Sequence, residues 1–243
     1  MSTKCQNCPL RQRSIFDDMT AAEVQFMQNF KSGEMLVDPG TTLMIEGSSS
    51  PQLYTVLEGM GLRYKTMLSG DRQVINFVFP GDFLGLQAGV MNEMHHSVEA
   101  STTMRLCVFD RKALWTLFRD HPRRAFDLTW IAAVEEHFLG ESLAILGHMS
   151  GIERVARALV RVHDRGAALG MVEDDAMPFP YKQQDLADAL GLSLVHTNKT
   201  LAKLRKEGVA DWRNGALSVT GYERLCEIAE LDPHRKPILR PLI

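Results

Sequence analysis

The sequence lacks the features of a secreted or membrane-inserted protein. Its four cysteines in 243 residues are too few for a disulfide scaffold. Its longest apolar runs, such as residues 74–80 and 128–134, are far shorter than the about 20 residues that span a bilayer. The polar start contains neither the apolar segment nor the cleavage site of a secretory signal. We therefore expect a cytoplasmic protein with no membrane partner.

A large excess of positive charge is also missing. The formal net charge is -3, which by itself argues against a nucleic-acid partner. The distribution of charge matters more than the sum, because residues 194–206 contain four basic side chains and no acidic one. A local basic surface of this kind is sufficient to contact DNA phosphates.

Between residues 31 and 109 the sequence alternates short apolar segments with turn residues. Examples of these turns are Asp38-Pro39-Gly40, Ser69-Gly70-Asp71 and Pro80-Gly81-Asp82. Many short strands separated by such turns indicate an all-β sandwich or barrel. After Phe109 the apolar spacing becomes helical, so we expect an α+β chain whose β domain comes first.

One long helix is predicted from His121-Pro122 to about Met149, and it contains two apolar stripes. The first stripe, which Glu141 interrupts, consists of Ile131, Val134, Phe138 and Ile145. The second contains Leu128, Trp130, Leu139, Leu143 and Leu146. Two stripes indicate burial against the chain's own domain and against a second copy. We predict that the four residues of the first stripe mediate dimerisation, and a helix buried within one subunit is the alternative.

Residues 181–219 are the most informative part of the sequence. Residues 183–190 have the pattern of a helix that ends at Gly191, and Ser193 is a natural N-cap for a second helix over 194–206. The dipeptide Asn214-Gly215 then favours a tight hairpin between two short strands. Helix, turn, helix and hairpin together predict a winged helix-turn-helix.

A helix-turn-helix presents the start of its second helix to the major groove, where side chains contact base edges. Lys199 can reach a guanine, Asn198 an adenine or a phosphate, and Val195 a thymine methyl group. Basic side chains such as Lys203 contact phosphates. The complete set of predicted DNA-binding residues is Lys182, Gln183, Ser193, Leu194, Val195, His196, Asn198, Lys199 and Lys203. The alternative is a protein-interaction scaffold that does not bind DNA.

These elements resemble the Crp/Fnr superfamily of bacterial transcription regulators. The motifs that carry the resemblance are Pro80-Gly81-Asp82-Phe83-Leu84-Gly85, Gln184-Asp185-Leu186-Ala187 and Gly191-Leu192-Ser193. The resemblance implies an N-terminal double-stranded β-helix (a jelly roll like that of cyclic nucleotide-binding domains), a long dimerisation helix and a C-terminal winged helix-turn-helix. It also implies a homodimer that binds a two-fold symmetric operator on double-stranded DNA and contacts RNA polymerase.

The resemblance also suggests how the chain is divided. We expect a sensor domain in residues 1–118, the dimerisation helix in 119–149, the DNA-binding domain in 150–231 and a tail in 232–243.

This sequence lacks the residues with which the cyclic-AMP-binding members of this superfamily hold their ligand. By the resemblance, Leu86 stands where those members have a glutamate that holds the ribose hydroxyls. His96-Ser97 stands where they have an arginine and a serine for the cyclic phosphate. Leucine cannot accept a hydrogen bond, and histidine is largely neutral near pH 7. We therefore expect a signal other than cyclic AMP, acting at the β-roll or at the N-terminal cysteines.

Three cysteines suggest a redox or oxygen signal as an alternative. Oxygen-sensing members of the superfamily hold an iron–sulfur cluster, and by that resemblance Cys5, Cys8 and Cys107 are candidate ligands of a cluster or another metal. Ser14 stands where a further cysteine is expected, and clusters are normally held by four thiolates. The other possibility is a metal-free N-terminal segment with Cys107 as a buried core thiol.

An enzyme is not expected from this sequence. Metal-dependent cupin enzymes share the β-roll, but their sites need two or three histidines and a carboxylate inside it. The predicted roll contains only His95 and His96, which with Met91 and Met94 are also the candidates for a haem or soft-metal site. The sequence shows no phosphate-cradling loop, nucleophile elbow or catalytic cysteine setting.

Overall fold

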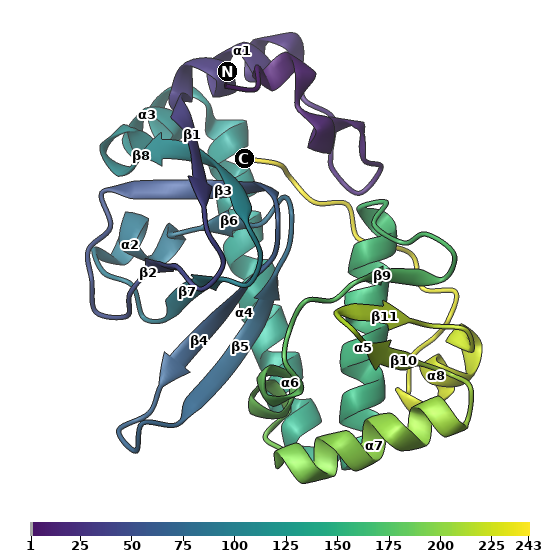
Figure 1. The fold of residues 1–243 in the computed structure, drawn as a ribbon. Coiled ribbons are helices and arrows are strands. Elements are labelled where there is room, and N and C mark those ends of the chain that lie inside the picture. Colours follow the sequence, from purple (N-terminus) through teal and green to yellow (C-terminus); the bar gives the residue numbers. More distant parts are fainter. Residues whose placement is uncertain (1) are drawn as a thin grey trace. The chain divides into compact units, whose positions relative to one another are not determined.

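The computed structural model describes residues 2–243 and divides the chain into two compact units (Figure 1). The N-terminal unit comprises the chain up to Glu135 together with Leu239–Ile243. The C-terminal unit comprises Glu136–Ile238. Within the described residues, no helix is both long enough and apolar enough to cross a membrane.

Two four-stranded sheets form the β-roll of the N-terminal unit. The first has the strand order β1 (Lys31–Val37), β8 (Met104–Asp110), β3 (Gln52–Glu58) and β6 (Phe83–Leu84). The second has the order β2 (Thr42–Met44), β7 (Ser97–Ala100), β4 (Gly61–Thr66) and β5 (Arg72–Val78). Neighbouring strands pair antiparallel. The all-β domain predicted from the turn pattern is confirmed.

The inner faces of the two sheets enclose an apolar core. Val56, Val98, Met104 and Leu106 are fully buried in it. Helical segments complete the unit: η1 (Cys5–Asn7), η2 (Pro9–Gln12), α1 (Ala21–Phe30), α2 (Leu86–Met91), η3 (Arg111–Ala113) and α3 (Leu114–Asp120).

The long helix α4 (Pro122–His148) begins and ends close to its predicted limits. Its start is fixed by Arg124, a fully buried residue whose Nη2 lies 2.7 Å from an Asp127 carboxylate oxygen and whose Nε lies 3.4 Å from Glu23 of α1. Glu23 in turn forms a capping box with Thr20 at the start of α1. The three charged groups therefore attach α4 to α1.

The two apolar stripes of α4 differ in exposure. In the first stripe, Ile131 and Ile145 are buried within their own chain. Leu139 and Leu143 of the second stripe are 51% and 73% exposed. Glu141, which interrupts the first stripe, accepts hydrogen bonds from Arg157 and Arg161 of the next helix, and this explains an acidic residue among apolar ones.

The C-terminal unit consists of a helical core and a small sheet. Its elements are α5 (Gly151–Ala168), β9 (Ala176–Pro178), α6 (Gln183–Leu190), α7 (Leu194–Lys206), β10 (Asp211–Arg213), β11 (Ala216–Ser218) and α8 (Tyr222–Ile228). The sheet has the order β10-β11-β9. Asn214 and Gly215 both have positive φ angles, 53° and 74°, between β10 and β11. The predicted hairpin is therefore confirmed.

Candidate nucleic-acid interface

Helices α6 and α7 begin and end at the residues predicted from the sequence. Gly191 between them has φ 61° and ψ 37°, and its N–H donates to the carbonyl of Ala187. This left-handed conformation, which glycine adopts without strain, turns the chain toward α7. The hydroxyl of Ser193 accepts a hydrogen bond from the backbone N–H of His196 at 3.2 Å and so caps α7. The structural roles predicted for Gly191 and Ser193 are confirmed.

The inner face of α7 packs in the C-terminal unit while its outer face remains open. The buried residues are Thr197, Thr200, Leu201 and Leu204. The exposed residues include Leu194, Val195, His196, Asn198, Lys199 and Lys203. The predicted recognition side chains therefore share the exposed face of one helix, whose inner face holds it in place.

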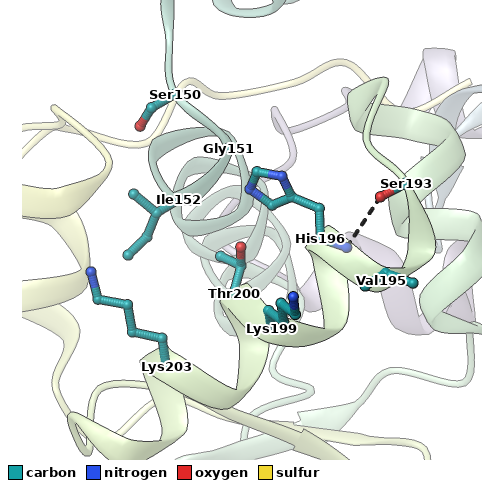
Figure 2. Close-up of a pocket in the computed structure, with 9 residues that line it drawn as sticks. All are labelled: Ser150, Gly151, Ile152, Ser193, Val195, His196, Lys199, Thr200 and Lys203. Carbon is teal, nitrogen blue, oxygen red and sulfur yellow. Dashed lines mark hydrogen bonds between the residues drawn. The ribbon is translucent and has the colours of Figure 1, made fainter.

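A hollow of about 600 Å³ lies between the first turn of α5 and this outer face (Figure 2). Its lining residues are Ser150, Gly151 and Ile152 from the α5 end and Ser193, Val195, His196, Lys199, Thr200 and Lys203 from the α7 end. The start of a helix carries partial positive charge, and two lysines lie across the hollow from it. This combination is suited to an anion such as a phosphate.

Gly151 has a packing role at the hollow. A Cβ atom at this position would lie 2.4 Å from Nε2 of His196, so only glycine lets the imidazole rest against the first turn of α5. Sequence reasoning missed the contribution of Ser150–Ile152 to this surface. The available signal was the Ser-x-x-Glu pattern of Ser150 and Glu153, which form a capping box at the start of α5.

The remaining predicted DNA-binding residues lie outside the hollow. Lys182 is exposed at the N-cap of α6, and its backbone N–H donates to Asp185 at 2.8 Å. Gln183 is half-buried in the first turn of α6. Leu194 and Asn198 are exposed on α7 but do not line the hollow.

The β-roll contains a buried guanidinium that sequence reasoning did not single out. Arg63 of β4 is opposite Val98 of β7, a core residue, and only 7% of its surface is exposed. Its Nη2 donates to the backbone carbonyl of Phe83 at 3.1 Å. Its Nη1 lies 3.0 Å from Glu135 of α4. An internal ion pair therefore joins the roll to α4.

His96 lies near this guanidinium and is neutral at pH 7. Burial lowers the pKa of His96 to about 4, and the positive charge of Arg63 contributes to the decrease. A neutral imidazole cannot balance the charge of a cyclic phosphate. Leu86, at the predicted ribose position, begins α2 and offers no acceptor there.

Cys5 and Cys107, two of the three candidate metal-ligating cysteines, are close to the ammonium group of Lys31. Lys31 has its Nζ 2.6 Å from Glu34 and 2.8 Å from the carbonyl of Thr3. Burial raises the pKa of Cys107 to about 12, and the nearby charge of Lys31 only partly opposes this. Burial also raises the pKa of Cys5, so neither group is a thiolate at neutral pH.

These residues provide three of the four thiolates that normally hold an iron–sulfur cluster. Ser14, where the resemblance places a further cysteine, is exposed. Within residues 2–243, no group of three or more His, Cys, Asp or Glu side chains is arranged to hold a metal ion.

Two family models match this chain. The cyclic nucleotide-binding domain matches residues 34–121, and the Crp-like helix-turn-helix domain matches residues 153–228. The chain is 27% identical to the nitrogen fixation regulation protein FixK of Bradyrhizobium diazoefficiens, over 93% of both chains. It is 26% identical to the transcriptional activator protein FnrL of Cereibacter sphaeroides, over 93% of this chain and 92% of the relative. The chain belongs to the Crp/Fnr family.

The fold of this Crp/Fnr protein is also that of a solved relative. The structure of FixK2 from Bradyrhizobium japonicum matches it with a TM-score of 0.72 and 23% identity, over 80% of this chain and 96% of that one. The predictions of the family, of the fold and of a DNA-binding transcription regulator are confirmed. The relatives named here are regulators rather than enzymes.

The buried imidazole of this Crp/Fnr regulator predicts a pH effect on stability. His96 has a lowered pKa in the fold, so the unfolded chain binds the additional proton between about pH 6.5 and pH 4. The contribution of His96 to the free energy of unfolding is therefore fully present above this range. It is lost as the pH falls through the range, with a slope of at most about 1.4 kcal/mol per pH unit. Replacing His96 with Gln removes this component, as thermal unfolding at several pH values would show. His137→Gln, a change at an exposed histidine, is the control.

The shortage of thiol ligands predicts a protein without a cluster. After anaerobic purification, we expect a colourless protein that contains no stoichiometric iron or sulfide. Cys5→Ser should leave the spectrum unchanged. The prediction is contradicted if the unaltered protein is brown and contains sulfide, and if both the colour and the sulfide are lost in the Cys5→Ser variant.

Proposed function

We propose that this Crp/Fnr regulator binds a two-fold symmetric operator as a homodimer, with α7 in the major groove of each half-site. The observation that supports this is the placement of Lys199 and Lys203 on the exposed face of α7, opposite the first turn of α5 (Figure 2). Basic side chains and a helix start on one surface match the phosphates on either side of a groove.

Individual side chains on this surface take different roles. We assign Lys199 to a guanine, Val195 to a thymine methyl group, and Leu194 and Asn198 to neighbouring base edges. Lys203 contacts phosphates, as do the groups around Lys182, Gln183, Ser193 and His196. Because Lys203 and His196 also line the hollow, a phosphate of the DNA backbone is its natural occupant.

Homodimer formation is supported by the exposed apolar residues of α4. Leu139 and Leu143 are one helical turn apart and so project from one side of the helix. Exposed leucines at this spacing are typical of helices that pair. The pairing surface we propose therefore includes Leu139 and Leu143 of the second stripe, whose Leu128 is buried in its own chain. Val134 and Phe138 of the first stripe, which are half-buried, lie at the border of this surface.

The signal we propose is a ligand or condition other than cyclic AMP. The neutral His96 and the apolar Leu86 lack the charge and the acceptor that a cyclic nucleotide needs. The alternative of redox sensing through a cluster at Cys5, Cys8 and Cys107 has less support, because Lys31 and Glu34 occupy their surroundings. By analogy with its activator relative FnrL, we also propose that the regulator acts in the cytoplasm and contacts RNA polymerase.

Substitutions on α7 separate base contacts from phosphate contacts. Lys199→Ala is expected to relax the preference at one base pair of each half-site by about 1–3 kcal/mol. Lys203→Ala is expected to weaken binding to all sequences alike and to reduce the salt dependence by the equivalent of about one phosphate contact per subunit. Fluorescence anisotropy with duplexes of varied sequence, at several salt concentrations, measures both effects.

The matched control for these variants is Lys112→Ala, which removes an exposed lysine of the N-terminal unit. It should bind every duplex like the unaltered protein. The proposed interface is wrong if both α7 variants behave like this control, and the scaffold alternative is supported if no duplex is bound at all.

A single charge on α4 is expected to separate the homodimer. Leu143→Glu places a carboxylate on an exposed apolar surface. Formation of the dimer would then remove water from this charged group, which is energetically costly. The expected result is a folded monomer in analytical ultracentrifugation, with operator affinity reduced at least about tenfold. Leu68→Glu, the same change at the fully exposed tip between β4 and β5, is the control and should remain dimeric.

A further inference from the structure

The segment Leu239–Ile243 follows the C-terminal unit in sequence but packs within the N-terminal unit. Pro241, Leu242 and Ile243 are buried, with Leu242 and Ile243 only 4% and 5% exposed. The hydroxyl of Thr55, in β3 of the roll, donates to the backbone carbonyl of Ile243. Figure 1 shows this end of the chain beside β3.

Backbone hydrogen bonds fix the segment against residues 15–17. Arg240 forms a parallel bridge with Phe16. Its N–H donates to the carbonyl of Ile15 at 2.8 Å, and its carbonyl accepts from the N–H of Asp17 at 2.9 Å. These are the main-chain hydrogen bonds of a single parallel β-bridge, which is the smallest unit of the pairing by which extended peptides bind to other chains.

A charged contact sets the register of the segment. The guanidinium Nη2 of Arg240 lies 3.2 Å from a carboxylate oxygen of Asp82, and both side chains are largely buried. The other carboxylate oxygen of Asp82 accepts a hydrogen bond from the N–H of Phe79 at 2.9 Å. Asp82 is therefore held by its own turn while it binds Arg240.

The packing of Phe16 beside the segment depends on a glycine. Gly81 has φ 85°, and a Cβ atom there would lie 2.1 Å from the ring of Phe16. The ring therefore lies directly on the Gly81 backbone. The backbone of residues 15–17, the Asp82 carboxylate and the Thr55 hydroxyl together form a docking site that contacts both the backbone and the charged side chain of the segment.

Phe83, which follows Asp82 in sequence, is linked to α4 through Arg63. The carbonyl of Phe83 accepts from Arg63, and Arg63 pairs with Glu135 of α4. A continuous series of polar contacts thus runs from Arg240 through residues 82–83 and Arg63 to Glu135.

We propose that this docking site is a peptide-binding site for an arginine followed by proline and two apolar residues, and that Leu239–Ile243 of the same chain is its occupant. Occupancy stabilises residues 81–83 and, through Arg63, the attachment of Glu135 and α4 to the roll. Binding of the segment is independent of the proposed function, whereas any effect on operator binding rests on it.

Peptide binding in trans tests the docking site directly. A variant that ends at residue 238 should bind a fluorescein-labelled peptide of residues 235–243 in an anisotropy titration. The same peptide with Arg240→Glu should bind about tenfold more weakly or worse, because repulsion replaces a charge-assisted hydrogen bond. Equal affinity of the two peptides, or no binding by a folded variant, overturns the proposal.

Hydrogen exchange in the full chain provides a second test that does not need the truncated variant to fold. Arg240→Glu should accelerate exchange of the Asp17 amide and, to a smaller extent, of amides in residues 122–135. Lys236→Glu, a matched change outside the docked segment, should leave both unchanged. Unaltered protection at Asp17 in the Arg240 variant contradicts docking, and altered protection there without any change in 122–135 contradicts the link to α4. Neither measurement uses DNA, so a failure of the docking proposal can be distinguished from a failure of the proposed operator binding.

Discussion

The apolar packing beneath α7 is the constraint on which the proposed interface depends. Leu201 and Leu204 face the interior, together with the methyl groups of two buried threonines. The opposite side chains are thereby held on the surface, and the turn at Gly191 fixes where the helix starts. Because the interior is closely packed, α7 cannot readily rotate about its own axis, and its exposed residues therefore keep a fixed arrangement. Base recognition requires such a rigid presentation.

Sequence reasoning succeeded where the signals were local. A helix end at glycine, a serine cap and an Asn-Gly turn each act within a few residues, and all three lie where they were expected. It failed where partners are distant in sequence. Arg63 with Glu135, and Asp82 with Arg240, are pairs that no local pattern marks. Period alone also cannot decide which of two apolar stripes on α4 faces its own chain, so the burial of Ile131 and Ile145 came from the fold.

The cysteines illustrate why spacing does not define a metal site. Cys5, Cys8 and Cys107 are near each other, as the resemblance to oxygen-sensing regulators implied. The electrostatics of the site are set by Lys31, whose charge is balanced by Glu34 and by the carbonyl of Thr3. Lys31 is already paired with Glu34, and the three neighbouring thiols are one fewer than the four thiolates that normally hold a cluster.

Glu135 lies at the point on α4 where one compact unit ends and the next begins. It is the last α4 residue of the N-terminal unit, and residues 136–148 continue the same helix for about 20 Å. Because the ion pair between Arg63 and Glu135 lies at the last α4 residue of this unit, it holds the helix against the roll at the point where α4 leaves it.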